Sequence, residues 1–333
     1  MQASAPAAHD LPQLRSLRRP RGSQDRLSAP RRLGFLFPGQ GSQAPGMGAE
    51  LLADPEIAAL SERCSAEVDL RHLLVDAQEE ELRLTQNAQP ALCFVGIGMT
   101  LLLRRAGLEP AAAAGHSVGE YAGLCCAGAL SPEETISAVI QRGRAMAEAV
   151  PAGETSMAAV LGLAPEAVTE ALAGIESCWP ANYNTPTQTV IGGSLAGLGE
   201  AERALTAAGA RRVIRLNVSA AFHTPFVEPA ARRLREVLDP LDWSEPAIPV
   251  AANLTGSPYP SGPDFPDVLE RQLKSPVRWS ECVRSLSELG VTDFLEVGPG
   301  RALRGMMKEL APGAGAHAAG APAAISELAG LLE

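Results

Sequence analysis

The 333-residue sequence is poor in aromatic side chains, in long apolar runs and in basic charge. Aromatic residues make up only 4% of the chain, so we expect a core built mainly from Ala, Leu and Val. No stretch approaches the roughly 20 consecutive apolar residues that a membrane-spanning helix needs. The formal net charge of −10 argues against a nucleic-acid partner, because phosphate binding needs a basic surface. The function therefore has to be sought elsewhere.

Paired cysteines are also lacking. None of the six cysteines forms a C-x-x-C pair. Disulfides are rare in reducing compartments, and zinc sites show characteristic close Cys spacings. We therefore expect reduced, mostly buried thiols in a cytoplasmic protein with no metal site.

The two ends of the chain differ in composition from the rest. Residues 1–32 contain seven Arg against two Asp, a local charge of +5 that leaves −15 on the remainder. This segment has no apolar stretch typical of a secretory signal. We expect a disordered extension, with a transit peptide or a start assigned too far upstream as alternatives. Residues 311–333 contain a Gly/Ala/Pro-rich stretch, for which we expect a flexible tail.

Between these ends the pattern predicts an α/β fold in two parts. Apolar runs and helix-start signals predict a large α/β domain with a parallel sheet, formed by residues 33–153 and 219–310. Residues 154–218 read as strand, helix, strand, helix and strand, which predicts a small ferredoxin-like α+β subdomain inserted into the large one.

The first chemical motif is Gly115-His116-Ser117-Val118-Gly119. G-x-S-x-G between a strand and a helix is typical of a nucleophile elbow, in which glycines permit a tight turn that exposes the serine hydroxyl. The helix that follows would direct backbone N–H groups at a developing oxyanion. An ordinary Gly-rich turn remains the alternative for so short a motif.

A serine nucleophile needs a base, and the chain offers five histidines. His9 and His317 fall in the ends expected to be disordered, His72 reads as a polar position on an amphipathic helix, and the side chain of His116 should diverge from its neighbour Ser117. His223 remains, on a loop between a strand and a helix, where a catalytic base is expected. The alternative is a loop histidine that caps the next helix. No acidic residue stands out as a partner for the imidazole.

A second Gly-rich loop, residues 37–43, follows the first predicted strand. In hydrolase-type sites, a loop at another strand end supplies a second N–H for the oxyanion. A phosphate-binding P-loop is disfavoured because the Lys-Ser/Thr pair is missing.

Six motifs in register carry a family resemblance. They are Phe37-Pro-Gly-Gln-Gly-Ser-Gln43, Gly115-His-Ser-Val-Gly-Glu-Tyr121, Gln141-Arg142-Gly143, Phe222-His223, Ser275-Pro-Val-Arg-Trp279 and Glu296-Val-Gly-Pro-Gly300. With them, residues 33–310 resemble the malonyl-CoA:acyl carrier protein transacylases and the acyltransferase domains of polyketide synthases. The resemblance implies the large α/β-hydrolase-like domain with its ferredoxin-like insertion.

The resemblance also implies a ping-pong reaction in fatty acid or polyketide biosynthesis. Ser117 would take a malonyl group from malonyl-CoA and pass it to the phosphopantetheine thiol of an acyl carrier protein, with His223 as the base. The oxyanion would be held by the backbone N–H groups of Gln40 and Val118, and the histidine would be oriented by the backbone carbonyl of Gln272. No cofactor is implied, and we expect a monomer.

Substrate choice is implied by three further positions. Arg142 matches an arginine that pairs with the malonyl carboxylate, for which a planar guanidinium is well suited. Without the resemblance, Arg142 would read as a solvated helix charge. Phe222 and Gln89 match acyl-pocket positions, and a bulky Phe222 favours malonyl over a methyl-branched group, a discrimination worth about 1–3 kcal/mol.

Two other functions stay open at this point. An acyl hydrolase that clears stalled acyl groups from carrier proteins would use the same Ser117 and His223. A non-catalytic scaffold would keep only the fold. Carrier proteins are usually acidic, so docking would need a basic patch, for which the chain offers two Arg clusters: Arg211, Arg212 and Arg215, or Arg232, Arg233 and Arg235.

Overall fold

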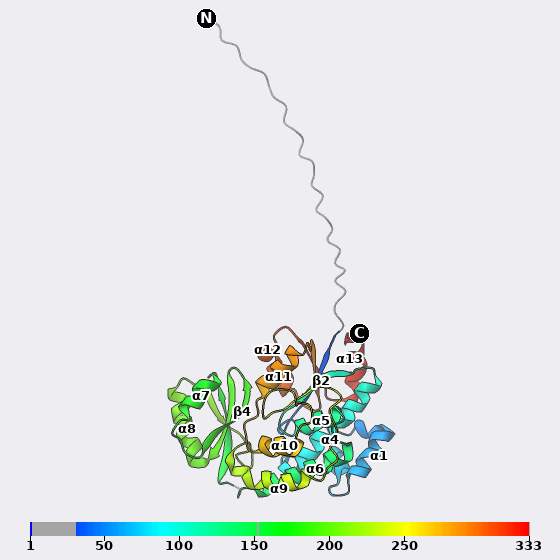
Figure 1. The fold of residues 1–333 in the computed structure, drawn as a ribbon, viewed down its shortest axis with the longest axis horizontal. Coiled ribbons are helices and arrows are strands. Elements are labelled where there is room, and N and C mark those ends of the chain that lie inside the picture. The colour runs from blue at the N-terminus through cyan, green and yellow to red at the C-terminus, as the bar shows by residue number, and fades with distance from the viewer. Residues whose placement is uncertain (2–30, 152, 333) are drawn as a thin grey trace. The chain divides into compact units, whose positions relative to one another are not determined.

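The computed structural model describes Met1 and residues 31–151 and 153–332. The expectation of a disordered extension concerns residues 1–32 and, apart from Met1, Arg31 and Arg32, lies outside the described residues. Residues from Arg31 onward form one compact unit. Figure 1 shows within this unit a smaller part with α7 and α8, drawn in green, beside a larger part that holds α4, α5 and α6.

The larger part is built on a five-stranded parallel sheet with strand order β7-β2-β1-β8-β9. Its strands are β1 Leu33–Phe37, β2 Pro110–Gly115, β7 Val250–Ala251, β8 Asp293–Val297 and β9 Gly315–Ala319. Strands β1 and β2 carry no polar side chain because a parallel sheet is covered on both faces, whereas β8 also contains the buried Asp293 and Glu296. All five residues of β1, for example, are buried.

Alternate residues of these strands enter two separate cores. Phe35, Phe37 and Ala113 pack into the large core on the α4 and α5 side. Leu36 and Ala114 point to the opposite face and pack with residues of α11 and α12. This alternation follows from the two-residue period of a strand.

The helices of the larger part surround the sheet. They are α1 Pro55–Cys64, α2 Leu70–Val75, α3 Glu79–Leu82, α4 Thr85–Arg105, α5 Gly119–Cys126, α6 Pro132–Glu148, α9 Glu228–Leu238, α10 Phe265–Leu273, α11 Trp279–Glu288, α12 Ala302–Leu310 and α13 Ile325–Leu332, with 3-10 turns η1 Leu51–Ala53, η2 Pro225–Val227 and η3 Pro322–Ala324. As the capping pattern predicts, Ser131 is the N-cap of α6, accepting a hydrogen bond from the backbone of Glu134, and Pro132 occupies the first turn.

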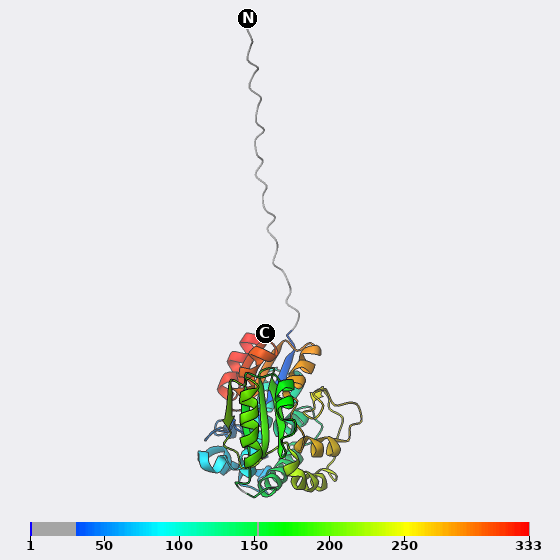
Figure 2. The same cartoon turned by 90° about the vertical axis from the view of Figure 1, so that its left-hand side faces the viewer.

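The smaller part is a four-stranded antiparallel sheet with strand order β4-β5-β3-β6. Its elements are β3 Thr155–Leu161, α7 Pro165–Ala171, β4 Cys178–Thr185, β5 Gln188–Ser194, α8 Leu195–Ala207 and β6 Arg212–Arg215. Side chains of α7 and α8 share a core with one face of the sheet, and Figure 2 shows these helices in front of it. The β-α-β-β-α-β order is that of a ferredoxin-like unit.

The structure differs from the sequence prediction in two places. Strand β4 is absent from the predicted element order, because Pro180 and two Asn residues give this segment a low strand propensity. The flexible tail predicted for residues 311–333 is also wrong: Gly315–Ala319 forms β9, parallel to β8, and Leu328 and Leu332 of α13 are buried. Strand β8 supplies backbone hydrogen-bonding partners for this segment, so a Gly/Ala-rich composition did not mean disorder here. No helix in the described part of the chain combines the length and apolar character needed to cross a bilayer.

Candidate active site

Ser117 lies on a sharp turn between β2 and α5, at the carboxyl edge of the parallel sheet. Its φ of +52° is a strained conformation for a residue with a side chain. The two flanking residues must be glycines because the neighbouring backbone leaves no space for a Cβ atom. A Cβ on Gly115 would lie 1.9 Å from the backbone of Gly119, and a Cβ on Gly119 would lie 2.2 Å from the carbonyl oxygen of Phe37. The G-x-S-x-G spacing therefore builds a true nucleophile elbow.

Ser117 and His223 are hydrogen-bonded, although 106 residues separate them. The Ser117 Oγ lies 2.7 Å from His223 Nε2, and the other ring nitrogen, Nδ1, lies 3.0 Å from the backbone oxygen of Gln272. A carbonyl can only accept, so Nδ1 carries the proton and Nε2 is free to accept from the serine. This carbonyl stands in the last turn of α10, and it also accepts from the backbone N–H of Ser275 at 3.4 Å.

Burial keeps His223 in its neutral form. The imidazole is 4% exposed. Burial, and then the positive charge of Arg142, lower the pKa of His223 to about 3. A neutral imidazole at physiological pH is the form that can accept a proton from the serine.

Arg142 of α6 is fully buried, and its guanidinium reaches the nucleophile. Its Nη2 lies 3.1 Å from Ser117 Oγ, and its Nη1 donates to Gln89 Oε1 at 2.6 Å. The guanidinium also lies over the ring of Tyr121, 5.6 Å from its centre. Its Nε has no hydrogen-bond acceptor among the described residues, and no carboxylate of that part of the chain pairs with it directly. A buried cation with unused donor capacity beside a serine hydroxyl can take up an anionic group.

Two backbone N–H groups near Ser117 form no hydrogen bond with the described residues, those of Val118 and Gln40. Val118 is the N-cap of α5, and Gln40 lies on the loop after β1. The loop is held against the elbow by a bond from His116 N to Phe37 O, at 2.9 Å, and the Gln40 side chain donates to Thr85. The two loops thus present free N–H donors of the kind that bind an oxyanion.

A cavity of about 320 Å³ opens at Ser117, and it is lined by loop and helix residues of the larger part and by strand residues of the smaller sheet. Phe222 and Gln89 form part of its wall, with Met146 from α6 and Met157 from β3. Backbone hydrogen bonds between β4 and Val277 join the smaller part to the larger one beside this cavity. The inserted subdomain therefore supplies one wall of the site.

Comparison with known proteins places this geometry in a family. A family model described as an acyl transferase domain matches residues 34–323. The chain belongs to this family. The chain is 41% identical to the malonyl CoA-acyl carrier protein transacylase of Bacillus subtilis over 286 residues, which cover 84% of this chain and 90% of that protein.

Solved structures of acyl transferases superpose closely. A malonyl CoA-acyl carrier protein transacylase from Coxiella burnetii has a TM-score of 0.86 and 34% identity, covering 91% of this chain and 98% of that one. A malonyl-transacylase in complex with its type II PKS acyl-carrier protein has a TM-score of 0.85 and 36% identity, covering 90% and 99%.

The acyl transferase fold brings all predicted site residues together around Ser117. His116 turns away from the serine, as predicted, and bonds Asn184 of β4 at 3.0 Å. The expectation for His72, a polar surface position, is also met, since this residue pairs with Glu81. The expectation for His317 is wrong, because it lies in β9 and pairs with Asp293 at 3.1 Å. His9 lies outside the described residues.

Sequence reasoning missed two residues that hold the elbow. Asn253, just after β7, accepts from Ser117 N at 2.7 Å and donates to Gly115 O at 2.7 Å, so its amide spans the turn. Glu120 of α5 is fully buried and contacts both Asn253 and Gln272. Glu120 stands inside the quoted motif, but the contact between residues 120 and 253 depends on the fold and has no local signal.

Proposed function

We propose that the protein transfers a malonyl group from malonyl-CoA to the phosphopantetheine thiol of an acyl carrier protein, through an ester on Ser117. The observation that carries the proposal is the pair of contacts at one oxygen atom. Ser117 Oγ lies 2.7 Å from the base and 3.1 Å from a buried guanidinium. The first contact provides a nucleophile, and the second places a cation where the carboxylate of a malonyl group would lie.

The acylation step uses the neutral His223. As Oγ attacks the thioester carbon, Nε2 takes the hydroxyl proton, and the negative charge moves to the former carbonyl oxygen. The N–H groups of Gln40 and Val118 bind that oxygen. When the C–S bond breaks, His223 returns the proton to the sulfur, so coenzyme A leaves as a thiol and the malonyl ester remains on Ser117.

The second half of the reaction repeats these steps with the carrier protein. Its pantetheine thiol gives a proton to His223 and attacks the ester carbon. Collapse of the intermediate breaks the C–O bond, and the proton passes to Ser117 Oγ. Gln272 O accepts from Nδ1 throughout and stabilises the imidazolium in both halves. The cycle needs no cofactor or metal.

Arg142 selects the acyl group in this proposal. A charge-assisted bond between a guanidinium and a carboxylate is stronger where water is excluded, and Arg142 is fully buried. Gln89 orients the guanidinium by accepting from Nη1. Phe222, 5% exposed, occupies the cavity wall next to His223 and leaves less room for a methyl branch.

Arg83 is suited to bind the phosphate groups of malonyl-CoA. It is the only Asp, Glu, Lys or Arg among the described residues that line the cavity. Its side chain is exposed and forms no ion pair with the described part of the chain. A phosphopantetheine arm carries its phosphate far from the thiol, so an arginine on the cavity wall would recognise coenzyme A and the carrier protein alike.

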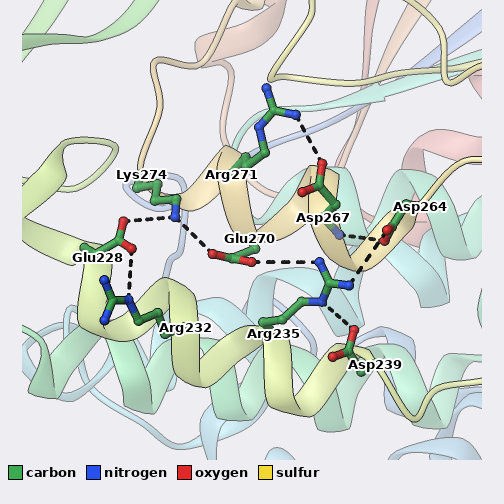
Figure 3. A network of polar contacts seen from close by, with 9 residues as sticks. All are labelled: Glu228, Arg232, Arg235, Asp239, Asp264, Asp267, Glu270, Arg271 and Lys274. Carbon is green, nitrogen blue, oxygen red and sulfur yellow. Dashed lines mark hydrogen bonds and ion pairs between the residues drawn. The ribbon is translucent and has the colours of Figure 1, made fainter.

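The carrier protein needs a basic surface, and the two candidate Arg clusters differ in their partners. On α9, Arg232 pairs with Glu228 at 3.0 Å and Arg233 pairs with Glu148 at 2.5 Å. Arg235 contacts several carboxylates, and Figure 3 shows it within a network that continues through Glu270 of α10 to Lys274, the residue that follows this helix. The α9 cluster is therefore already neutralised.

The cluster around β6 is less compensated. Arg215 lies 3.8 Å from Glu202, while Arg211 and Arg212 pair with no acidic side chain in the described ranges. Leu216, Asn217 and Val218, which follow β6 directly, line the cavity. We therefore place the carrier protein on the β6 side. One chain supplies every site residue named above, which supports the proposal that the protein acts as a monomer. We also propose that it acts in the cytoplasm, in fatty acid or polyketide biosynthesis.

Acylation and transfer test the function directly. Incubation with malonyl-CoA is expected to add one malonyl group to Ser117 by mass spectrometry, and holo carrier protein is expected to remove it as malonyl carrier protein. Ser117→Ala should abolish the adduct. If free malonate dominates over malonyl carrier protein, the enzyme is a hydrolase and the proposal is wrong. If no adduct forms, the fold serves as a scaffold.

A further inference from the structure

The mechanism leaves the buried carboxylate of Glu120, close to Ser117, unused. It lies on the first turn of α5, three residues after Ser117, and is fully buried. Its Oε1 accepts from the Tyr259 hydroxyl at 2.6 Å, and its Oε2 accepts from Gln272 Nε2 at 3.1 Å and from the backbone of Asn253 at 3.2 Å. Three donors converge on it, an environment made for a carboxylate.

Two of these donors belong to residues that hold the reacting groups. Asn253 bonds the elbow at Ser117 N and at Gly115 O. Gln272 has more roles: its Nε2 also donates to Ser117 O at 3.0 Å, its Oε1 lies 3.4 Å from Arg142 Nη2, and its backbone oxygen accepts from His223. One residue thus contacts the nucleophile turn, the base and the cation.

The orientation of the Gln272 amide depends on Glu120. An amide can be turned so that its oxygen and nitrogen exchange places, but an ionised carboxylate accepts only. Glu120 therefore keeps the Nε2 side of Gln272 toward itself and the Oε1 side toward Arg142. Glu120 also supplies a negative charge that balances Arg142, with the Gln272 amide between the two groups. A buried cation without a counter-charge would lower the stability of the fold.

We propose that Glu120 is a positioning residue: its negative charge holds Gln272 in the orientation that presents the backbone carbonyl to His223 and the side-chain oxygen to Arg142. The inference rests on the proposed function. Loss of the charge would loosen the acceptor of the His223 proton without removing the base, the nucleophile or the cation.

Glu120 would change its charge near neutral pH. Burial raises its pKa to about 7, against the opposing effect of its hydrogen bonds and of Arg142. The other titratable groups facing it keep their state there. Tyr121 from α5, Tyr259 from the loop after β7 and Cys282 from α11 have raised pKa values and stay neutral, and Arg142 from α6 stays charged.

Glu120→Gln isolates the charge, because a glutamine can keep every bond. Its oxygen can accept from Asn253 and Gln272, and its amide nitrogen can donate to the Tyr259 oxygen. We expect kcat for malonyl transfer to fall about tenfold at pH 8, because a neutral oxygen holds the Gln272 amide less firmly than a charged one, with no rise in KM for malonyl-CoA. A misfolded fraction would lower the apparent kcat without changing KM, so the fraction of reactive Ser117 is titrated in each protein before the kcat values are compared.

The pH dependence of kcat/KM distinguishes a positioning role from a merely structural one, because a structural residue would not change its shape. His223 has a pKa of about 3 in the free enzyme, so its titration cannot produce a sloping limb of the kcat/KM profile near neutral pH. For the wild type we expect kcat/KM to rise through a pKa of about 7, and for Glu120→Gln a profile that is flat in this range. Tyr259→Phe removes one donor from the carboxylate and should move the limb to higher pH, which tests the proposal even if Glu120→Gln does not fold.

Glu296 offers a matched control. It is another buried carboxylate, 1% exposed, and it caps α12 through the backbone of Leu303 and Arg304. Glu296→Gln should keep the limb near pH 7. The proposal is overturned if Glu120→Gln keeps both the wild-type kcat and the limb, or if Glu296→Gln loses the limb equally.

A second probe separates this proposal from the function on which it rests. A sulfonyl fluoride reacts with an activated serine whatever the natural acyl group. If malonyl-CoA fails to acylate the wild type, the proposed function fails, while slower sulfonylation of Ser117 in Glu120→Gln would still support the positioning role. Equal sulfonylation rates in the two proteins would reject it.

Discussion

Gly119→Ala should cripple the enzyme although the change adds one methyl group. The new Cβ would lie 2.2 Å from the carbonyl oxygen of Phe37 and 2.8 Å from its carbonyl carbon. An unstrained C···O contact is about 3.3 Å, so the elbow and the β1 loop would have to separate by about 1 Å. Both are backbone, so no side chain can yield instead.

The separation would act on the oxyanion donors. Gln40 N belongs to the displaced loop and Val118 N to the elbow, and a misplacement of about 1 Å costs roughly 100-fold in rate. Overpacking should also lower the free energy of unfolding by about 1–3 kcal/mol. The rate of Ser117 acylation by malonyl-CoA, followed by intact-protein mass, and urea unfolding measure the two effects.

Gly123→Ala is the matched control in the same helix. Its Cβ would meet Val250 Cγ1 at 3.6 Å, an ordinary contact. Replacing a helical glycine there should leave acylation unchanged and stabilise the protein by up to about 1 kcal/mol. If folded Gly119→Ala acylates at the wild-type rate, close backbone approach is not what requires this glycine, and the reasoning is refuted.

Four further outcomes are expected. Arg142→Ala should reduce malonyl transfer at least about tenfold while acetyl transfer changes little, because only malonyl loses a charged bond; parallel losses in steady-state assays would refute the clamp. Arg83→Ala should raise KM for malonyl-CoA but not for malonyl-N-acetylcysteamine, which has no phosphate; equal effects on both thioesters would exclude phosphate binding. Arg212→Glu should raise KM for the carrier protein more than Arg233→Glu does, and the reverse ranking would move the docking site to α9. The pKa of Glu120 is raised from 4.5 to about 7, so between these pH values the native carboxyl holds a proton that the unfolded chain has lost. The contribution of this group to the free energy of unfolding therefore falls as pH rises from about 4.5 to about 7. In urea unfolding, Glu120→Gln should gain about 3 kcal/mol relative to wild type over that range, and a constant difference would contradict the shift.

The sequence was sufficient to predict a structural feature wherever that feature depends on residues that are neighbours along the chain. The elbow at Ser117 is a local turn whose glycine spacing has a steric cause, and Ser131-Pro132 marks a helix start through its own capping bond. His223 could be reached by elimination because histidines are few. The role expected of Gln272 rested on a family resemblance, and the structure provides the 3.0 Å contact that fits it.

Other features depended on contacts between distant residues. Strand β4 and strand β9 have compositions that predict loops, and they are strands because β5 and β8 supply the hydrogen-bonding partners. The two Arg clusters look alike as sequence. The i,i+4 pairs of Arg232 with Glu228 and of Arg235 with Asp239 could be read from spacing. The pairs of Arg233 with Glu148 on α6 and of Arg235 with Glu270 on α10 depend on helix packing.

The sequence by itself predicted the proposed nucleophile, the proposed base and the two-part α/β architecture. These predictions follow from local turn geometry, from the small number of histidines and from the periodicity of apolar residues. The tertiary structure alone decided which groups surround them. Asn253 bonds Ser117 across 136 positions of the chain, and the contacts of Asn253 and Tyr259 with Glu120 span 133 and 139 positions. Such contacts arise from sheet order and helix packing, and no spacing along the chain encodes them.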